Sequence, residues 1–494
     1  MSRDMKEKTL TKTIGTNAKE RANAWGPDRH PYISEEQAFP DDFFWCGAMC
    51  ATQAEGAFDE GGKGLSVFDV VPIGEERKAI ATGLLDNRDG YIGTYFPSRK
   101  AADFYHRYRE DVELMAKLGL NSYKVSISWS RIFPTGEEER PSEEGLQFYR
   151  NLIKKLKDHD MEPILEITHW DLPLALSVKY GGWKSRKLVD CYMKLVKALC
   201  DGLGEEISYW LTIHEPDCMH DYPFVACGLV KEEEEKWPQD KLDASHHMFV
   251  ASARAAAYIR KRFPKAIVGT MIGLTYKYPY SCDPRDQLLA VRERMLNWLY
   301  ADVLIRGYYP SYAIKEFERK GLQIPFEEGD EQLLRENTIS FMMFSYYNSQ
   351  VIRHDSYDVI SNPYVENDDD PTGLRVVLNL IYDRYQIPII IGELAYKSID
   401  TLTEGEVHDE NRIRFLKTHL RAIKDAIFED GIDVRGCMFW ETVDSISVGK
   451  GVMSERYGLI YVDADDEGNG TYDRYVKDSY KYLKQVIADK GKGL

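Results

Sequence analysis

Two acidic residues stand where a pair of carboxylates could do chemistry together. Glu215 directly follows the apolar run 208–214, and Glu393 closes the apolar run 388–393. Hydrolysis of a glycosidic bond needs one carboxyl group to protonate the leaving oxygen and a second to attack the sugar or to activate water. A separation of about 5–5.5 Å gives retention of configuration, and about 6.5–9.5 Å gives inversion. The sequence therefore predicts a catalytic pair, provided that the fold brings the two groups together.

Other apolar runs also lead into polar or aromatic residues that suit a sugar pocket. Gln53 follows the first run, His169 and Trp170 end the third, and Trp440 ends the eighth. Aromatic faces can pack on pyranose C–H groups, and the candidates for this are Trp45, Trp170, Tyr347 and Trp440. Gln53, His169 and Glu441 could hydrogen-bond sugar hydroxyls. Each residue also has a structural explanation, such as core packing for a tryptophan or helix capping for Gln53, but together they favour one polar pocket with aromatic walls.

The elements that must position these residues alternate between short apolar runs and longer amphipathic segments. Such alternation is typical of a parallel sheet covered by helices. The strand candidates are Phe43–Cys50, Ser122–Ser128, Pro163–His169, Ser208–His214, Ala266–Leu274, Ile339–Tyr346, Pro388–Glu393 and Val434–Trp440. The helix candidates include Ala101–Leu118, Gly145–Lys157, Ser185–Cys200, Leu242–Arg262 and Glu410–Phe428.

Eight such units favour a closed (β/α)₈ barrel, an α/β TIM barrel of one domain over residues 39–488. Residues 1–38 are polar and are expected to form an arm. Long βα loops are expected at Gly74–Asn87, Val365–Thr372 and Asp463–Thr471. In this fold the chemistry gathers at the carboxyl ends of the strands, where the polar residues fall.

Composition excludes several classes of function. The formal net charge of −17 disfavours nucleic acid and anionic membranes as partners. The eight cysteines are scattered singly without zinc-ligand spacing, so we expect free thiols and no metal. The first forty residues lack the apolar core of a signal peptide, and no segment is long and apolar enough to span a membrane, which predicts a cytoplasmic protein.

From about residue 39 to 484 the chain resembles glycoside hydrolase family 1. The motifs that carry the resemblance are FFWCG from Phe43, QAEG from Gln53, SISWSRIFP from Ser126, THWDLP from Thr168, GGW from Gly181, WLTIHEP from Trp210, SYY from Ser345 and RYGLIYVD from Arg456. The resemblance implies a retaining double displacement on a small carbohydrate, without metal or cofactor. It implies Glu215 as acid/base and Glu393 as nucleophile.

The resemblance also implies roles for residues around the pair. Gln53, His169 and Trp440 match sugar-contacting residues of the family, and Tyr347 matches the tyrosine that hydrogen-bonds the nucleophile. Within the family, the run from Glu60 to Ser66 and the segment Phe344–Tyr347 are similar to 6-phospho-β-glucosidases.

Ser447 supports the same subgroup, because ordinary β-glucosidases carry at this position a glutamate that holds the 4- and 6-hydroxyls of the sugar. A carboxylate there would repel a 6-phosphate, whereas a serine can donate to one. The resemblance therefore implies a β-glucoside or its 6-phosphate as substrate, and Ser447 and Tyr457 as contacts near the 6-position.

Four positions depart from the family pattern. His214 replaces an asparagine that contacts the sugar 2-hydroxyl, and Lys124 replaces an arginine that steadies the nucleophile. Leu394 follows the nucleophile in place of the usual asparagine, and Glu455 replaces a phosphate-binding lysine. A carboxylate facing a phosphate is unfavourable unless a cation, Lys450 or Arg456, compensates.

Three functional hypotheses follow. The first is a working retaining β-glycosidase on a glucose-like or 6-phosphoglucose-like glycone. The second is a glycosidase fold whose drifted pocket binds sugar with weak or no catalysis. The third is a metal-dependent barrel hydrolase that would use His169, Asp171, His214 and Glu215. Alternation along a strand disfavours the third, because neighbours such as His214 and Glu215 are expected to face opposite sides.

Overall fold

In the computed structural model, which describes residues 37–363, 365 and 369–494, eight short apolar segments pair into one closed parallel barrel. Around the barrel the order is β1, β11, β10, β7, β5, β4, β3 and β2. The barrel strands are β1 (Phe44–Ala48), β2 (Ser122–Ser126), β3 (Glu162–Glu166), β4 (Tyr209–His214), β5 (Ile267–Gly273), β7 (Phe341–Tyr346), β10 (Ile389–Leu394) and β11 (Val434–Phe439). All eight predicted strands are confirmed, with ends that differ by a few residues.

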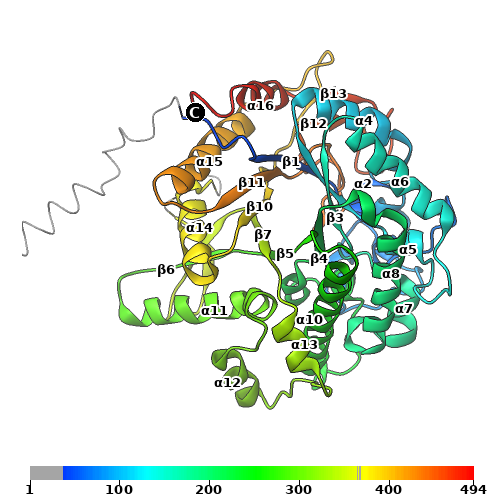
Figure 1. Ribbon diagram of the computed structural model, residues 1–494, viewed down its shortest axis with the longest axis vertical. Helices are drawn as coiled ribbons and strands as arrows, with labels where there is room; N and C mark the ends of the chain where they lie inside the picture. Colours follow the sequence, from blue (N-terminus) through cyan, green and yellow to red (C-terminus); the bar gives the residue numbers. More distant parts are fainter. Residues whose placement is uncertain (1–36, 364, 366–368) are drawn as a thin grey trace, which may run out of the picture.

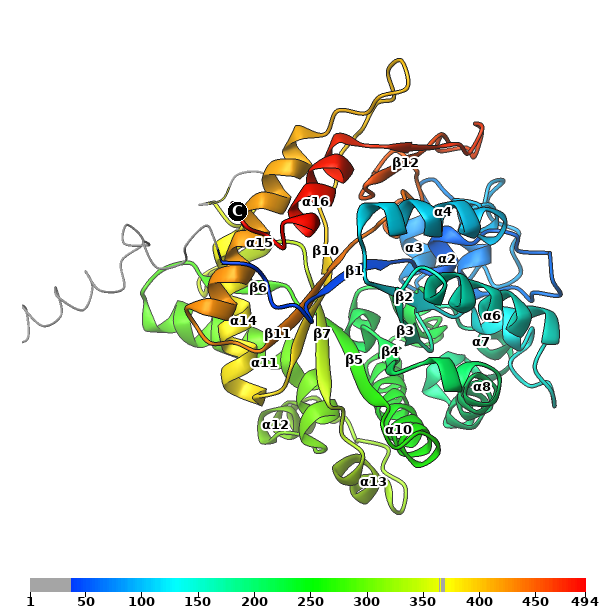
Figure 2. The ribbon, with the colours of Figure 1, turned by 45° about the horizontal axis from the view of Figure 1, so that its top comes forward.

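Helices form an outer ring around the barrel (Figure 1), and the view in Figure 2 shows the strands converging at the centre of that ring. The helices are α2 (Ala51–Ala54), α3 (Arg77–Ala81), α4 (Phe104–Leu118), α5 (Trp129–Ile132), α6 (Glu143–Lys157), α7 (Leu174–Tyr180), α8 (Lys187–Leu203), α9 (Pro223–Cys227), α10 (Trp237–Arg262), α11 (Pro284–Arg306), α12 (Ser311–Lys320), α13 (Asp330–Glu336), α14 (Pro371–Tyr385), α15 (Glu410–Phe428) and α16 (Asp478–Ala488). The five predicted helices correspond to α4, α6, α8, α10 and α15.

Local sequence explains where these helices begin and end. Helix α6 starts after Ser142, whose side chain accepts a hydrogen bond from the backbone N–H of Gly145, and two glutamates occupy its first turn. Both features stabilise a helix N-terminus. Helix α4 ends at Gly119, which adopts a left-handed conformation that suits glycine. The apolar face of α4, with Val112 and Met115 fully buried, packs into the core.

The interior of the barrel has a small apolar core of its own. It includes Cys46, Ile164, Leu211, Met271, Met343, Ile390 and Met438, and Trp440 lies at its edge. A much larger cluster fills the layer between strands and helices. Because the strands are buried on both faces, they read in the sequence as nearly continuous apolar runs. The polar residues at the carboxyl ends of the strands are thereby held on one rim.

The predicted loops are confirmed only in part. Within Gly74–Asn87 the structure forms α3, because Ile80 and Ala81 are buried and fix this turn against the core. The segment Asp463–Thr471 is irregular and joins β12 (Ile460–Val462) to β13 (Arg474–Val476) as an antiparallel pair. Of Val365–Thr372, residues 366–368 lie outside the described residues, and α14 already begins at Pro371.

Smaller elements complete the fold. A second sheet, which the sequence did not predict, joins β6 (Tyr276–Pro279), β8 (Ser349–Ile352) and β9 (Val359–Ser361). Residues 1–36 of the predicted arm lie outside the described residues. Among the residues that the structure describes, no helix combines the length and apolar character that a membrane span requires. All eight cysteines are free thiols, as expected.

Candidate active site

The backbone turns sharply after β4 and aims Glu215 into the barrel mouth. Glu215 has a φ of +38°, in the left-handed region, and Pro216 follows it. A non-glycine residue in this region is uncommon and breaks the alternation of a strand. As a result His214 and Glu215 face the same space, with His214 Nε2 and Glu215 Oε2 3.7 Å apart. The expectation that these neighbours point to opposite sides is therefore wrong.

Glu393 lies near the end of β10 and is held from two sides. The Tyr347 hydroxyl donates to Glu393 Oε2, as the family resemblance implied. The ammonium of Lys124, on β2, lies 4.0 Å from Glu393 Oε1. That oxygen is buried and has no hydrogen-bond partner among the described residues. One oxygen of Glu393 is thus fixed and the other is free to meet a ligand.

The two predicted carboxylates meet. Single oxygens of Glu215 and Glu393, together with a ring nitrogen of His214, all lie within 4.8 Å of one another. His214 Nε2 is 3.7 Å from Glu215 Oε2 and 3.6 Å from Glu393 Oε1. This spacing matches the short gap of retaining glycosidases and is too small for the water that an inverting enzyme places between its carboxylates.

Burial and mutual repulsion set the protonation of the pair. Burial raises the pKa of Glu215, against hydrogen bonds from Ser345 and Cys218 that lower it. Burial and the charge of Glu215 raise the pKa of Glu393, and Lys124 and Tyr347 oppose that rise. Because two adjacent anions repel, the pair holds one proton over a range of pH. Glu393 is the group within 4.0 Å of Lys124, so the ionised form belongs there and the proton belongs on Glu215.

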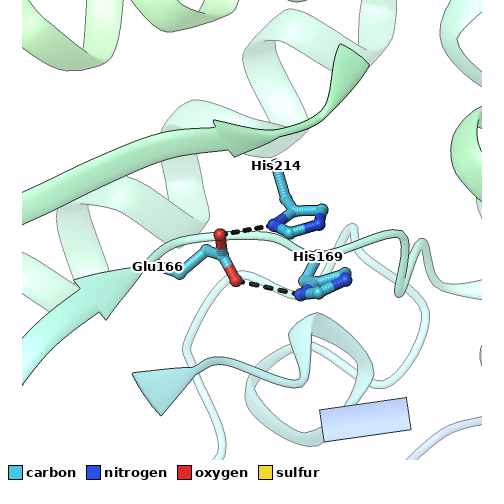
Figure 3. A group of neighbouring side chains, drawn as sticks. All are labelled: Glu166, His169 and His214. Atoms are coloured by element: carbon cyan, nitrogen blue, oxygen red, sulfur yellow. Dashed lines mark hydrogen bonds and ion pairs between the residues drawn. The ribbon is translucent and has the colours of Figure 1, made fainter. Parts of the chain in front are cut away.

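Glu166, at the end of β3, organises the floor of the site, and sequence reasoning missed it. Its carboxylate contacts His214 Nδ1 at 2.7 Å, His169 Nδ1 at 3.0 Å and Lys124 Nζ at 2.9 Å. Figure 3 shows both imidazole rings on this one carboxylate. The signal that could have found it is Glu166 between Leu165 and Ile167 in the predicted strand Pro163–His169, where a buried charge needs a partner.

Glu441 is buried, and both oxygens of its carboxylate accept hydrogen bonds from Ser445. The remaining expected sugar contacts line the same rim, with one exception. Gln53 is buried, its Nε2 donates to the carbonyl of Ile446 at 2.8 Å, and its Oε1 has no partner among the described residues. Trp170 donates to the carbonyl of His214, and the Trp440 ring lies 5.9 Å from that of His169. Trp45 is the exception, because it packs between Phe39, Phe43 and Phe439 in the core.

The residues assigned to the sugar 6-position come together around Glu455. Lys450 Nζ lies 2.9 Å and Lys397 Nζ 3.3 Å from Glu455 Oε1. Ser447 lies near enough to help lower the pKa of this carboxyl group, against the effect of its burial. Tyr457 packs edge-on against Tyr347 at 6.4 Å between ring centres, and Tyr347 in turn donates to Glu393. Lys397 was not predicted, because 58 positions separate it from Glu455.

A cavity of about 710 Å³ adjoins Glu215. Glu215, Ser345 and Tyr347 form one end, and Trp237, Tyr300 and Phe317 from α10, α11 and α12 contribute to its wall. Gln53, His169, Trp170, His214 and Trp440 do not line it. Apart from Tyr347, these expected sugar contacts therefore lie outside the cavity, which extends on the side of Glu215.

The ligand set of the metal hypothesis is not brought together. Asp171 is buried elsewhere, where it accepts from the backbone N–H of Trp129 and from Thr168 Oγ1. The groups of His and acidic side chains close enough to share an ion, within the described part of the chain, are Glu166 with His169 and His214, and His214 with Glu215 and Glu393. In the first group the Lys124 ammonium already supplies the positive charge.

Comparison with known proteins decides the family. The model of glycosyl hydrolase family 1 matches residues 35–492. The chain belongs to glycosyl hydrolase family 1. It is therefore a glycoside hydrolase, in agreement with the geometry of its two carboxylates.

Relatives and solved structures extend over nearly the whole chain. An aryl-phospho-β-D-glucosidase of Bacillus subtilis is 40% identical over 92% of this chain and 99% of its own length. A 6-phospho-β-glucosidase of Escherichia coli is 40% identical over 92% and 99%. A β-glucosidase from Thermotoga maritima in complex with castanospermine superposes with a TM-score of 0.79 at 27% identity, over 92% of this chain and 99% of that one. The (β/α)₈ barrel is confirmed.

Proposed function

We propose that this family member hydrolyses β-glucosides or their 6-phosphates by double displacement, with Glu393 as nucleophile and Glu215 as acid/base. The observation that carries the proposal is the meeting of the two carboxylates within 4.8 Å beside His214. The short gap favours direct attack by Glu393 over activation of a water. The eight free thiols suit a reducing compartment, and we place the reaction in the cytoplasm.

In the first step the ionised Glu393 attacks the anomeric carbon, and the C–O bond to the leaving group breaks. Glu215 gives its proton to the departing oxygen, so a neutral alcohol leaves into the cavity of about 710 Å³. Tyr347 keeps the attacking carboxylate in place through Oε2, and Lys124 keeps it ionised.

In the second step Glu215, now a carboxylate, takes a proton from water as that water attacks the anomeric carbon from the opposite side to Glu393. The glycosyl–Glu393 ester breaks, Glu393 leaves as a carboxylate, and Glu215 is protonated again. Two inversions give net retention. NMR of the first-formed sugar tests this directly, because we expect the β-anomer before mutarotation, and an initial α-anomer would contradict the mechanism.

Activity should depend on pH with a maximum. Since Glu393 must be ionised and Glu215 protonated, kcat/KM falls at low pH as Glu393 gains a proton and falls at high pH as Glu215 loses one. The raised pKa of Glu215 keeps its proton available toward neutrality. We expect the basic limb to disappear in Glu215→Gln when the substrate carries a good leaving group. A basic limb that persists in that variant would show that another group supplies it.

The relatives and the Lys397–Lys450 pair favour a 6-phosphate on the glycone. The first two relatives are named for phosphorylated glucosides. Lys397 and Lys450 both pair with Glu455. Two positive charges and one negative charge leave this group of three side chains with a net charge of +1. A phosphate could take the place of the Glu455 carboxylate between the two ammonium groups. The Glu455 carboxylate itself favours a second candidate, an unphosphorylated β-glucoside whose hydroxyls it would accept from.

One comparison separates the two candidates: kcat/KM for a β-glucoside and for its 6-phosphate with the same aglycone. If the phosphate is the substrate, Lys450→Ala should lower kcat/KM for it by about three- to tenfold, because an exposed ion pair contributes little. Glu455→Gln should raise it by about tenfold or more, because removing a like charge removes repulsion of about 1.4 kcal/mol or more.

The matched control is Lys154→Ala. Lys154 lies on α6, is about as exposed as Lys450 and pairs with Asp158. The substitution should change neither substrate's rate. An unchanged phosphate preference in Lys450→Ala would contradict the role of Lys450. A wild-type preference for the free glucoside would select the second candidate and assign Glu455 to hydroxyl binding.

A further inference from the structure

Glu166 is a fully buried carboxylate that belongs to neither chemical step. Its oxygen Oε1 contacts His214 Nδ1 at 2.7 Å, and its oxygen Oε2 contacts His169 Nδ1 at 3.0 Å and Lys124 Nζ at 2.9 Å. The Glu166 and Lys124 side chains are completely shielded from solvent. Such a charge persists in the interior only when it is paired and hydrogen-bonded, and both conditions are met here.

These contacts fix where the imidazole protons lie. An ionised carboxylate accepts hydrogen bonds and cannot donate, so both Nδ1 atoms must carry a proton. One Lys124 N–H donates to Glu166 at 2.9 Å. Lys124 also lies 3.4 Å from His214 Nδ1, but it cannot donate there, because that nitrogen already holds the proton of its 2.7 Å contact with Glu166. Figure 3 shows the rings side by side, each presenting Nδ1 to one oxygen of Glu166.

Both rings are neutral. The two imidazoles stack with 3.3 Å between ring centres and Lys124 beside them, so a second or third positive charge in this space would be strongly repelled. Burial lowers the pKa of His214 well below its usual value and that of His169 to about 4. With a proton on Nδ1 and no net charge, each ring presents an unprotonated Nε2 that only accepts hydrogen bonds.

The free nitrogen of His214 faces the two catalytic carboxyl groups, of which Glu393 is the ionised acceptor. Nε2 lies 3.6 Å from Glu393 Oε1 and 3.7 Å from Glu215 Oε2, which is too long for hydrogen bonds. Glu393 Oε1 has no partner within the described chain. Two acceptors at this spacing are satisfied by a donor that lies between them. In the proposed double displacement the anomeric carbon lies against Glu393, so a hydroxyl on the neighbouring ring carbon is a donor within reach of this space.

We propose that Glu166 is a positioning residue that makes His214 a hydrogen-bond acceptor, so that the site selects glycones with a donor on the carbon next to the anomeric carbon. The assignment of the proton pattern stands on the structure, and the assignment of the sugar position rests on the proposed function. A side-chain amide at position 214 would offer a hydrogen-bond donor as well as an acceptor. The histidine offers only an acceptor, so it restricts the sugar substituent at this position to a donor.

Two measurements test the proposal. Nitrogen-15 NMR of labelled histidines in the wild-type chain should show two rings with protonated Nδ1 and unprotonated Nε2. In Glu166→Gln the amide cannot accept from both rings, so one ring should move its proton to Nε2. The ratio of kcat/KM between a 2-hydroxy and a 2-deoxy glycoside should fall by about tenfold in Glu166→Gln. Any intrinsic reactivity difference between the two substrates cancels in that comparison.

A double-mutant cycle shows whether Glu166 acts through His214. In the His214→Asn background, Glu166→Gln should change the 2-hydroxy/2-deoxy ratio by less than about twofold, since the intermediary is gone. Glu55→Gln is the matched control, because Glu55 is also a buried carboxylate and pairs with Arg131 away from the histidines. It should leave both the ratio and the histidine spectra unchanged.

The outcomes distinguish failure of the role proposed for Glu166 from failure of the proposed function. A wild-type spectrum with protonated Nε2 or a charged ring at position 169 or 214 would overturn the proposal without any variant having to fold. Independent, additive effects in the cycle would also overturn it. If no glycoside is turned over, the proposed function fails, and the spectra still decide whether Glu166 sets the protons. Glu166→Asp, which keeps the charge, should keep the wild-type proton pattern.

Discussion

Glu393→Ala should abolish hydrolysis while the barrel stays folded. We expect kcat/KM to fall at least about 10⁴-fold for every substrate, because without the carboxylate no glycosyl ester forms, and loss of a nucleophile has effects of this size in other covalent mechanisms. The thermal midpoint should be unchanged or higher, since the variant loses a buried carboxyl that the neighbouring Glu215 repels. Initial rates and circular dichroism on the same preparation measure both.

Added azide tests directly whether Glu393 is the nucleophile. The small anion fits the space left by the Glu393 side chain and should partly restore turnover of an activated substrate, with an α-glycosyl azide as product. Glu393→Gln is the matched control, because it removes the charge but fills the space, and azide should not rescue it. Equal rescue of both variants, or substantial activity in Glu393→Ala without azide, would show that another group is the nucleophile.

Glu215→Ala should separate substrates by their leaving groups. For an alkyl glucoside, whose oxygen must be protonated as it departs, we expect a loss of about 10²–10⁴-fold in kcat/KM. For a dinitrophenyl glucoside the first step needs no proton and should be nearly unaffected, so the glycosyl enzyme accumulates because Glu215 is missing as the base of the second step. A rapid release of one equivalent of dinitrophenol, followed by slow turnover, is the expected time course.

Mass spectrometry of the intact chain should find the added glycosyl group in Glu215→Ala and lose it in Glu215→Ala/Glu393→Gln. Cys218→Ser serves as the control, because Cys218 donates to Glu215 Oε2 at 3.2 Å but has no part in proton transfer to the substrate. It should keep the wild-type dependence on the leaving group. Equal losses on good and poor leaving groups in Glu215→Ala would argue against the acid role.

The alternative hypothesis, a pocket that binds sugar with weak or no catalysis, rests on four departures from the family pattern. They are His214, Lys124, Leu394 and Glu455. The structure shows that two of the four are linked, because Lys124 and His214 share Glu166. The charge of Lys124 is balanced by Glu166, and His214 lies within 4.8 Å of both catalytic carboxyl groups. Absence of turnover on glucosides, 6-phosphoglucosides and an activated fluoroglycoside would favour the binding alternative.

The sequence predicted the barrel because its strands are buried on both faces. Runs such as Ile389–Leu394 and Phe341–Tyr346 are almost entirely apolar, and their alternation with amphipathic helices allows few other folds. It also predicted Glu215 and Glu393. Burying a carboxylate at the end of such a run costs free energy, which favours a functional role for it at the rim of the barrel. The family motifs then gave the two residues separate roles.

Tertiary structure alone decided which side chains meet. A strand buried on both sides gives no pattern to tell which way Glu166 points, so its contact with His169 and His214 could not be derived from spacing. The left-handed backbone at Glu215 reversed the side expected from strand alternation. Trp45 joined the core and Lys397 reached Glu455, because closing the barrel brings together segments that are far apart along the chain. Local sequence determined the elements and the chemical groups, whereas closure of the barrel determined the partners, the charges and the proton positions.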